Sequence, residues 1–377
     1  MKRKLRLHNT GVEEVRAVLV GIDTGKDDFP ESMAELALLA ESAGSIPRAS
    51  VVGRRGSVDP ALFIRSGKAN ELLRTMNEHD AELAIINHAI SPTQQRNLER
   101  HLGKHVIDRT GLILDIFAQR AKSHLGKTQV ELANVRYRMS RLVRAWSHLE
   151  RQKGGIGLRG GPGETQMELD RRMLATKAKR LEAELEKLQR QQRTQRRARA
   201  RNQVFSVSLV GYTNAGKSTL FNQLTHANAL AMNQLFATLD TTSRKLFIQE
   251  GVECVISDTV GFIKALPTTL IEAFKSTLEE SREADLLLHV VNMANPNHHE
   301  QIIAVNKILE EIKAASIPQI IVLNQIDRLD IKANHEKDEY GRISTIRLSA
   351  KTGEGIELLK EAILQLVVAK QSAETEI

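Results

Sequence analysis

Residues 211–218 read Gly-Tyr-Thr-Asn-Ala-Gly-Lys-Ser, the G-x-x-x-x-G-K-[ST] pattern of a phosphate-binding loop. Alternating apolar residues at 205–209 predict a strand before the loop, and residues 219–224 predict a helix after it. In that context the backbone N–H groups of the loop and the N-terminus of the helix face phosphates. Lys217 can reach the β and γ phosphates, and the Ser218 hydroxyl can bind Mg²⁺. We therefore expect a nucleoside triphosphate site on an α/β sheet.

Three further motifs follow in the order that a GTPase requires. Asp258-Thr-Val-Gly261 ends an apolar strand, which predicts a carboxylate for Mg²⁺ and a glycine N–H near the γ phosphate. Asn324-Gln-Ile-Asp327 ends another apolar strand, where the Asp327 carboxylate can pair with two N–H donors on the edge of guanine. Ser349-Ala-Lys351 is expected to close the base pocket. Adenine offers no matching pair of donors, so the expected nucleotide is GTP.

Hydrophobic periodicity divides the chain into three parts. In residues 1–111, short apolar runs alternate with helical patterns, which predicts an N-terminal α/β domain with a small parallel sheet. Residues 112–203 show almost no strand signal and two long amphipathic patterns, which predict an antiparallel helical hairpin. Residues 204–368 are expected to form a doubly wound P-loop GTPase domain, and residues 369–377 a tail.

A glycine-rich segment, residues 154–163, separates the two helical patterns. Six glycines and one proline in ten residues cannot continue a helix, so the segment is expected to form the hairpin tip, with Glu164-Thr165 starting the second helix. One interpretation is a flexible connector. The other is a contact surface, because a plain turn needs only about two to five residues and this one also carries Arg159.

Positive charge is concentrated between Arg171 and Arg201, where twelve Lys or Arg stand against three Glu. This stretch alone carries more net charge than the +8 of the whole chain, so the remainder is close to neutral. Such a block is either a solvated helix face or a contact for nucleic acid.

Composition favours a folded protein of the cytoplasm. The chain is 41% hydrophobic and 27% charged, and no run approaches the roughly 18 apolar residues of a membrane-spanning helix. Residues 1–10 are basic and no apolar run follows them, so no secretory signal is expected. The single cysteine, Cys254, lies in an apolar run, which favours a reducing compartment.

The motifs together resemble the HflX family of ribosome-associated GTPases. The resemblance rests on the phosphate loop, on Leu235-Phe-Ala-Thr-Leu-Asp-Thr-Thr-Ser-Arg244, on Asp258-Thr-Val-Gly-Phe-Ile263 and on the glycine-rich tip, and it covers nearly the whole chain. It implies that Thr238 is the switch threonine that meets Mg²⁺ and the γ phosphate. It also implies a protein that binds the large ribosomal subunit, places the tip near the peptidyl-transferase region, and splits stalled or idle ribosomes after stress.

These arguments and the resemblance give a set of expected site residues. The catalytic residues are expected to be Lys217, Thr238 and Gly261, and the Mg²⁺ ligands Ser218, Thr238 and Asp258. The expected nucleotide-binding residues are Gly211, Tyr212, Thr213, Asn214, Ala215, Gly216, Lys217, Ser218, Thr219, Phe236, Ala237, Thr238, Leu239, Asp240, Asp258, Thr259, Val260, Gly261, Asn324, Gln325, Ile326, Asp327, Ser349, Ala350 and Lys351. The expected contacts with ribosomal RNA are Gly155, Gly157, Arg159, Gly160 and Gly161.

Three positions modify these expectations. Gln325 stands where the guanine motif usually has a lysine, so somewhat weaker binding with unchanged base choice is expected. Phe262 follows Gly261 where many GTPases have a glutamine that orients water, so slow hydrolysis without a partner is expected. Asn214 stands where similar GTPases have an asparagine that helps to hold K⁺, which makes K⁺ a second candidate ion.

Two other functional classes stay open at this stage. One is a GTP-dependent RNA-binding factor in ribosome assembly that never splits ribosomes. The other is a GTPase at a membrane surface, although the basic helices lack the aromatic-rich face of interfacial helices. In the main interpretation the partners are GTP or GDP and the large ribosomal subunit with its RNA, without DNA or stable membrane insertion, and the protein is a monomer.

Overall fold

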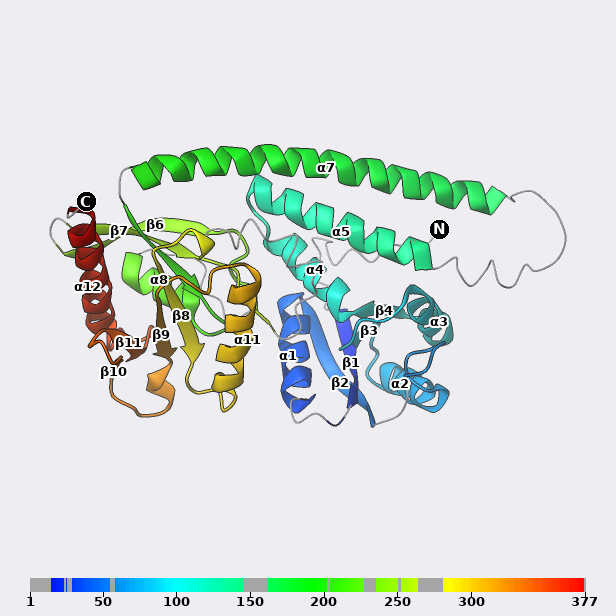
Figure 1. Cartoon of the computed structure of the whole chain (residues 1–377). Coiled ribbons are helices and arrows are strands. Elements are labelled where there is room, and N and C mark those ends of the chain that lie inside the picture. Colours follow the sequence, from blue (N-terminus) through cyan, green and yellow to red (C-terminus); the bar gives the residue numbers. More distant parts are fainter. Residues whose placement is uncertain are drawn as a thin grey trace. The chain divides into compact units, whose positions relative to one another are not determined.

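The computed structural model describes residues 15–23, 25, 29–54, 58–144, 162–201, 204–226, 235–249, 252–263 and 281–375 (Figure 1). The chain divides into two compact units, and the division falls inside one long helix, between Glu186 and Lys187. Among the described residues, no helix combines the length and apolar character needed to cross a membrane.

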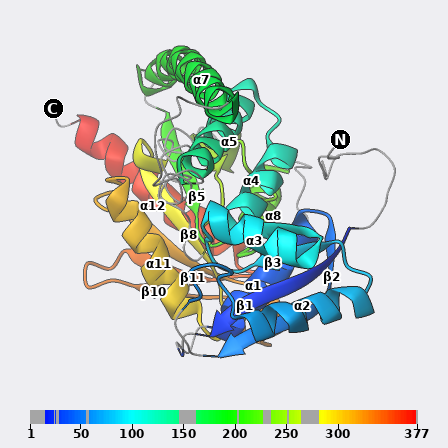
Figure 2. The ribbon, with the colours of Figure 1, turned by 90° about the vertical axis from the view of Figure 1, so that its right-hand side faces the viewer.

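The first unit begins with a four-stranded parallel sheet of order β2-β1-β3-β4. Its strands are β1 (Val15–Asp23), β2 (Ser45–Arg54), β3 (Leu83–Ile86) and β4 (His105–Asp108). They alternate with α1 (Phe29–Ser42), α2 (Ser66–Glu78), α3 (Pro92–Leu102) and α4 (Arg109–Arg120) (Figure 2). The expected parallel α/β sheet is confirmed.

The reversal of strand order at β1 places the helices on both faces of this sheet. The chain moves one way from β1 to β2 and the other way from β2 to β3, and right-handed crossovers then put α1 and α2 on opposite faces. In keeping with this, α1 contacts α4, and α2 contacts α3. Both faces are covered, so all four residues of β3 and six of the nine residues of β1 are buried.

The expected domain boundary after residue 111 falls inside α4. Gly111, Leu112 and Ile113 are all buried, and α4 contacts β3 and β4 of the sheet. The apolar face of α4 therefore belongs to the first sheet, and the boundary drawn from the sequence is wrong at this point.

The middle of the chain is helical wherever the structure describes it. Helix α5 (His124–Arg144) packs beside α7 (Pro162–Arg201) through an apolar seam. The seam consists of Leu132, Val135, Ala178 and Leu181, with Met139, Leu174 and Leu185 packed against it. Side-chain contacts join the helices at His124 and Glu184, at Glu131 and Lys177, and at Arg136 and Glu182. In Figure 1 the two helices run in opposite directions. The two helices are antiparallel.

The second helix of the hairpin begins earlier than expected. Helix α7 includes Pro162, two residues before the expected start at Glu164. Proline is favoured in the first turn of a helix because its missing N–H would have no partner there. Residues 154–161 of the expected tip lie outside the described residues.

The second unit is built on a seven-stranded sheet of order β10-β11-β9-β8-β5-β7-β6, with antiparallel pairs only at its two edges. The strands are β5 (Phe205–Val210), β6 (Thr242–Gln249), β7 (Val252–Asp258), β8 (Leu286–Asn292), β9 (Gln319–Asn324), β10 (Asn334–Lys337) and β11 (Ile343–Arg347). The helices with defined bounds are α8 (Lys217–Thr225), α11 (His298–Glu311), α12 (Ile356–Thr375) and the 3₁₀ turn η1 (Ile326–Arg328). This is the expected P-loop GTPase fold.

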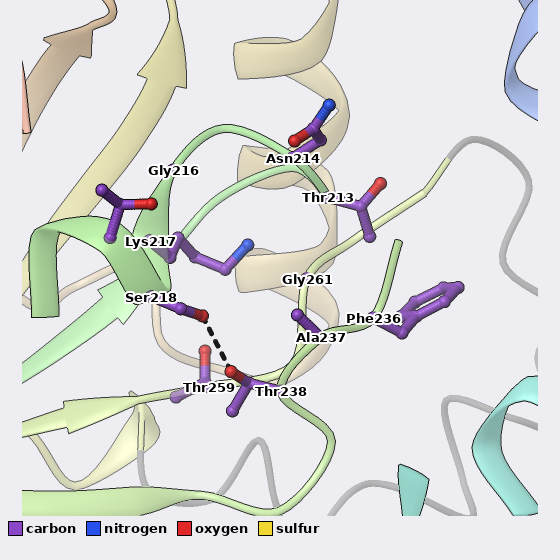
Figure 3. Close-up of a pocket in the computed structure, with 11 residues that line it drawn as sticks. Thr213, Asn214, Gly216, Lys217, Ser218, Phe236, Ala237, Thr238, Thr259 and Gly261 are labelled. Carbon is purple, nitrogen blue, oxygen red and sulfur yellow. Dashed lines mark hydrogen bonds between the residues drawn. The ribbon is translucent and has the colours of Figure 1, made fainter. Parts of the chain in front are cut away.

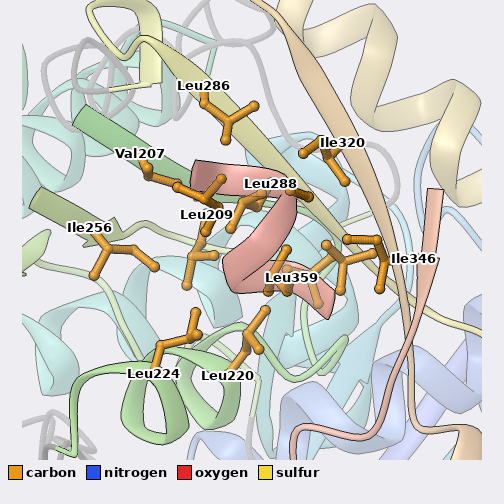
Figure 4. Close-up of a cluster of buried hydrophobic side chains, with 14 of the residues drawn as sticks. Val207, Leu209, Leu220, Leu224, Ile256, Leu286, Leu288, Ile320, Ile346 and Leu359 are labelled. Atoms are coloured by element: carbon orange, nitrogen blue, oxygen red, sulfur yellow. The ribbon is translucent and has the colours of Figure 1, made fainter. Parts of the chain in front are cut away.

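The main core of this unit lies where the sheet packs against α8 and α12. It combines strand residues such as Leu209 and Leu288 with Leu220 of α8 and Leu359 of α12 (Figure 4). The loop that follows β5 therefore starts from the packed centre of the sheet.

The expected tail after residue 368 is part of α12. The Lys370 ammonium lies 2.7 Å from the Asp285 carboxylate and 5.7 Å from the centre of the Phe205 ring. These polar contacts lie beyond the last apolar turn of the helix. The apolar periodicity does not record them, so the predicted helix ended too early.

Candidate nucleotide-binding site

The loop after β5 contains two glycines that no other residue could replace without displacing a neighbour. Gly211 has φ +146°, and a Cβ on it would lie 2.2 Å from the Val290 carbonyl oxygen of β8. Gly216 has φ +94°, and a Cβ on it would lie 2.2 Å from Nδ2 of Asn324. Close packing against neighbouring strands thus sets the path of the loop, as the motif predicts.

A pocket opens at the carboxyl ends of the central strands, under this loop (Figure 3). Its lining residues are Thr213, Asn214, Gly216, Lys217, Ser218, Thr219, Phe236, Ala237, Thr238, Thr259 and Gly261. The strand order reverses at β5, and α/β sheets bind ligands at such a reversal.

Lys217, the first residue of α8, is buried at the base of the pocket. Its ammonium donates hydrogen bonds to the carbonyl oxygens of Gly211 and Tyr212, at 3.0 and 2.8 Å. Burial lowers the pKa of Lys217 to about 8, an effect that the charge of Asp258 opposes. A buried ammonium held mainly by neutral carbonyls gains from an anion placed beside it, so this position suits a phosphate.

Three oxygen-bearing side chains converge beside Lys217. The Ser218 and Thr238 hydroxyls each donate to Oδ2 of Asp258 at 2.7 Å. The two hydroxyl oxygens lie 2.8 Å from each other (Figure 3). Oδ1 of Asp258 is buried and has no hydrogen-bond partner among the described residues. Burial raises the pKa of Asp258, whereas Lys217 and the two hydroxyls lower it. A buried carboxylate with an unused oxygen and two adjacent hydroxyls fits Mg²⁺, which takes oxygen ligands.

Gly261 and Phe262 follow β7 and lie against the phosphate loop. A Cβ on Gly261 would lie 2.8 Å from Cγ2 of Thr213 and 2.9 Å from Nζ of Lys217. The backbone of Phe262 bonds to Gly211 and Thr213, and its side chain is only 1% exposed. Phe262 is therefore an apolar anchor in the core, and it brings no polar group to the pocket.

The guanine motif is tied to the phosphate loop by side-chain hydrogen bonds. Asn324 donates to the Ala215 carbonyl oxygen at 2.9 Å and accepts from the Ala350 N–H at 2.9 Å. The Ser349 hydroxyl donates to Oδ1 of Asp327 at 2.7 Å. Three segments that are distant in sequence therefore hold Asp327 at an exposed position where its carboxylate can accept from a ligand.

Comparison with known proteins places this arrangement in a family. Residues 30–118, 120–199 and 206–325 match family models described as GTP-binding GTPase N-terminal, GTP-binding GTPase Middle Region and 50S ribosome-binding GTPase. The chain is 49% identical to the GTPase HflX of Escherichia coli (strain K12), over 93% of this chain and 82% of that protein. It is 46% identical to the GTPase HflX of Magnetococcus marinus, over 91% of this chain and 79% of that protein.

This chain belongs to the HflX family of GTPases. Like other HflX proteins it binds and hydrolyses GTP, and P-loop GTPases generally use Mg²⁺. Its fold resembles that of a GTP-binding protein from Sulfolobus solfataricus in complex with GDP, at a TM-score of 0.50 and 24% identity over 94% of this chain and 99% of that one. A related complex with GDP gives a TM-score of 0.54 at 24% identity.

In this HflX protein, all of the residues that line the pocket are among those expected from the sequence. The structure does not bring every expected residue there. The expected residues outside the pocket lining are Gly211, Tyr212, Ala215, Leu239, Asp240, Asp258 and Val260, and the guanine motif and residues 349–351 contribute nothing to that cavity. The expected RNA contacts, Gly155, Gly157, Arg159, Gly160 and Gly161, lie outside the described residues.

One contact beside the guanine motif was not expected from the sequence. Arg328 donates a hydrogen bond to Gln325 within the guanine motif, at 3.0 Å. Its spacing of three residues from Gln325 was the only signal in the sequence that could have identified it.

Proposed function

We propose that this GTPase binds the large ribosomal subunit and splits stalled or idle ribosomes, as a part of a stress response. The observation that carries the proposal is the continuity between the basic helix and the nucleotide site. Helix α7 ends at Arg201 and β5 begins at Phe205, so only a few residues join the helix to the strand that carries the phosphate loop. Ribosomes are cytoplasmic, and the proposal places the protein there.

Family membership supports a ribosomal partner, because the model that matches residues 206–325 describes a 50S ribosome-binding GTPase. The basic stretch of α7 supplies charge for an RNA backbone, and attachment of this kind weakens steeply as salt rises. The proposed tip contacts are Gly155, Gly157, Arg159, Gly160 and Gly161. Glycine lets RNA approach closely, and the Arg159 guanidinium can stack on a base or pair with a phosphate.

The nucleotide site is proposed to work through the groups that the structure brings together. Lys217 would hold the β and γ phosphates, and the Gly261 N–H would meet the γ phosphate. Ser218, Thr238 and Asp258 would hold Mg²⁺, which neutralises phosphate charge when bound. Asp327 would read guanine, with Asn324 and Ser349 fixing its surroundings. Thr238 belongs to the segment before β6, so loss of the γ phosphate would release that segment and switch the protein.

Hydrolysis is proposed to be slow until the ribosome is bound. Phe262 is buried, and the described pocket lining contains no carboxylate or imidazole and only one amide, that of Asn214. Because Phe262 replaces the glutamine that orients water in many GTPases, the partner must supply such a group or order the site.

Sedimentation of intact ribosomes through sucrose gradients tests the proposal. We expect the protein with GTP, or with a non-hydrolysable analogue, to shift intact ribosomes into free subunits, and isolated large subunits to raise phosphate release by at least tenfold. If the protein sediments with large subunits but leaves intact ribosomes whole, splitting is excluded and a role in subunit assembly is favoured. If large subunits change the rate of phosphate release less than twofold relative to the free protein, the ribosome is not the activator.

A second ion is proposed beside the phosphates. Asn214 lines the pocket, and its φ of +61° holds it at the turn of the loop. An amide oxygen there can help to hold K⁺, so GTP turnover should be faster in KCl than in NaCl of equal concentration. Asn214→Ala should remove the difference, and equal rates of the unaltered protein in the two salts would exclude the ion.

A further inference from the structure

The guanine motif of this chain contains a side-chain relay that the sequence pattern does not predict. We propose that Arg328 is a positioning residue of the nucleotide site, acting through Gln325 on the phosphate loop. In this pair the Gln325 amide makes the contact with the loop, and Arg328 supplies the positive charge. The inference rests on the nucleotide site proposed above and deepens it.

The first contact of the relay lies within η1. The Arg328 N–H donates to the Gln325 carbonyl oxygen at 3.1 Å, which closes a 3₁₀ turn. Side chains three residues apart lie above one another in such a turn. Accordingly, Nη1 of Arg328 donates to Oε1 of Gln325 at 3.0 Å. Because a guanidinium can only donate, this bond fixes the Gln325 amide with its oxygen toward Arg328.

The second contact crosses from the guanine motif to the phosphate loop. Nε2 of Gln325 donates to the Asn214 carbonyl oxygen at 3.2 Å, joining residues 111 positions apart. Gln325 and Asn214 both have left-handed backbones, with φ of +69° and +61°. Residues other than glycine rarely hold this conformation without support, and the bond between the two turns provides it.

The two hydrogen bonds reinforce each other. A cationic donor on Oε1 polarises the amide and makes its N–H a stronger donor to the next acceptor in the chain of bonds. Arg328 therefore acts on the phosphate loop without touching it. Asn214 lines the phosphate pocket, so a loop braced at Asn214 should release a bound nucleotide more slowly.

This relay revises the expectation for Gln325. Gln325 replaces a lysine whose stem usually packs over the nucleotide, and the exchange was expected to weaken binding somewhat. It also removes a positive charge from that position. With Arg328 three residues later, the charge remains in the motif and the contact with the loop is retained. Asp327 is separate from the relay, so the base preference should not depend on Arg328.

The test measures release of a fluorescent GDP analogue from the full chain by stopped flow. Arg328→Ala should raise the dissociation rate about three- to fivefold, the range expected for loss of one partly exposed hydrogen bond and its charge. Lys332→Ala, which removes an exposed positive charge four residues away, is the matched control and should change the rate less than 1.5-fold.

The decisive comparison repeats Arg328→Ala in a Gln325→Lys chain. A lysine at 325 carries its own charge, so Arg328→Ala should change the dissociation rate of the GDP analogue less than 1.5-fold in that chain. The midpoint of thermal unfolding and the preference for GDP over xanthosine diphosphate should both stay unchanged. No effect of Arg328→Ala in the natural chain overturns the inference. An equal effect in both chains overturns it too, because Arg328 would then act independently of Gln325. Failure of the unaltered chain to bind the GDP analogue would instead refute the proposed nucleotide site.

Discussion

At the scale of single residues, Asp327 is the residue proposed to read the base. Its carboxylate is exposed and held by the Ser349 hydroxyl, so it can accept two N–H donors from guanine. Asp327→Asn should weaken GTP binding about a hundredfold and favour xanthosine triphosphate, because an amide can donate to the extra carbonyl of xanthine. Competition of the two nucleotides for the protein measures this. Asp330→Asn, a nearby exposed control, should change neither affinity, and a preserved preference for GTP in Asp327→Asn would exclude the assignment.

A second residue, His289, should make the stability depend on pH. It is 1% exposed in β8, and Gln319 donates to its Nδ1. Burial, aided by the charge of Lys217, lowers the pKa of His289 from its ordinary 6.5 to about 4. Above pH 6.5 the ring is neutral in both the folded and the unfolded chain. As the pH falls from 6.5 toward 4, only the unfolded chain takes up the proton, so stability is lost in that window.

Urea unfolding at pH 7 and pH 5 checks this effect. Relative to His289→Gln, the natural chain should lose about 2 kcal/mol more unfolding free energy between the two values. His335→Gln, at a more exposed histidine of the same unit, should retain the pH dependence of the natural chain. If the natural chain and His289→Gln lose the same unfolding free energy between pH 7 and pH 5, the His289 ring does not titrate as proposed.

At the scale of elements, one carboxylate joins the helical hairpin to the first sheet. Asp108 ends β4, caps α4 by accepting from the Gly111 N–H, and accepts from the Tyr137 hydroxyl of α5 at 2.7 Å. Arg141 of α5 also pairs with it, at 2.5 Å. Burial raises the pKa of Tyr137, and the charge of Asp108 raises it further. The hydroxyl therefore stays protonated and can donate its hydrogen bond. A buried carboxylate with this many donors fixes α5 to the sheet.

Asp108→Asn should therefore loosen α5. We expect amides in residues 130–144 to exchange about tenfold to a hundredfold faster, which corresponds to about 1.4–3 kcal/mol for loss of a buried charge from its partners. GDP affinity should not change, since these groups lie outside the pocket lining. Asp80→Asn, at an exposed partner of Arg16, is the control and should leave exchange in α5 unaltered. If amides of α5 exchange at the same rate in Asp108→Asn as in the natural chain, the contacts of Asp108 with Tyr137 and Arg141 do not hold α5 in place.

At the scale of the whole molecule, nucleotide binding and ribosome splitting should be separable. The pocket proposed to bind nucleotide lies in the second unit, and the glycine-rich segment 154–163 belongs to the first. Deletion of residues 155–163, or Arg159→Glu, should leave GTP affinity unchanged and reduce splitting at least tenfold. Sucrose gradients and nucleotide titration measure the two properties. A deletion variant that splits ribosomes at the natural rate would show that the tip is only a connector.

The sequence by itself determined the local features. The glycines at 211 and 216, the strands that lead into the phosphate loop, Asp258 and Asn324, and the helix after the loop follow from steric rules and periodicity within a few residues. For α3, Ser91 and Gln94 form a capping box and Gly103 ends the helix at φ +63°, so local residues set both ends of this helix. Such signals act between neighbours, and the sequence displays them directly.

Tertiary structure alone decided the features that depend on distant partners. Helix α4 crosses the expected boundary because the first sheet buries its face, and α12 continues past residue 368 because Lys370 meets Asp285. The effect of Gln325 likewise depends on Asn214, a residue 111 positions away. No local pattern records which side chains the folded backbone brings together, because burial and pairing are set by packing between elements that are far apart in sequence.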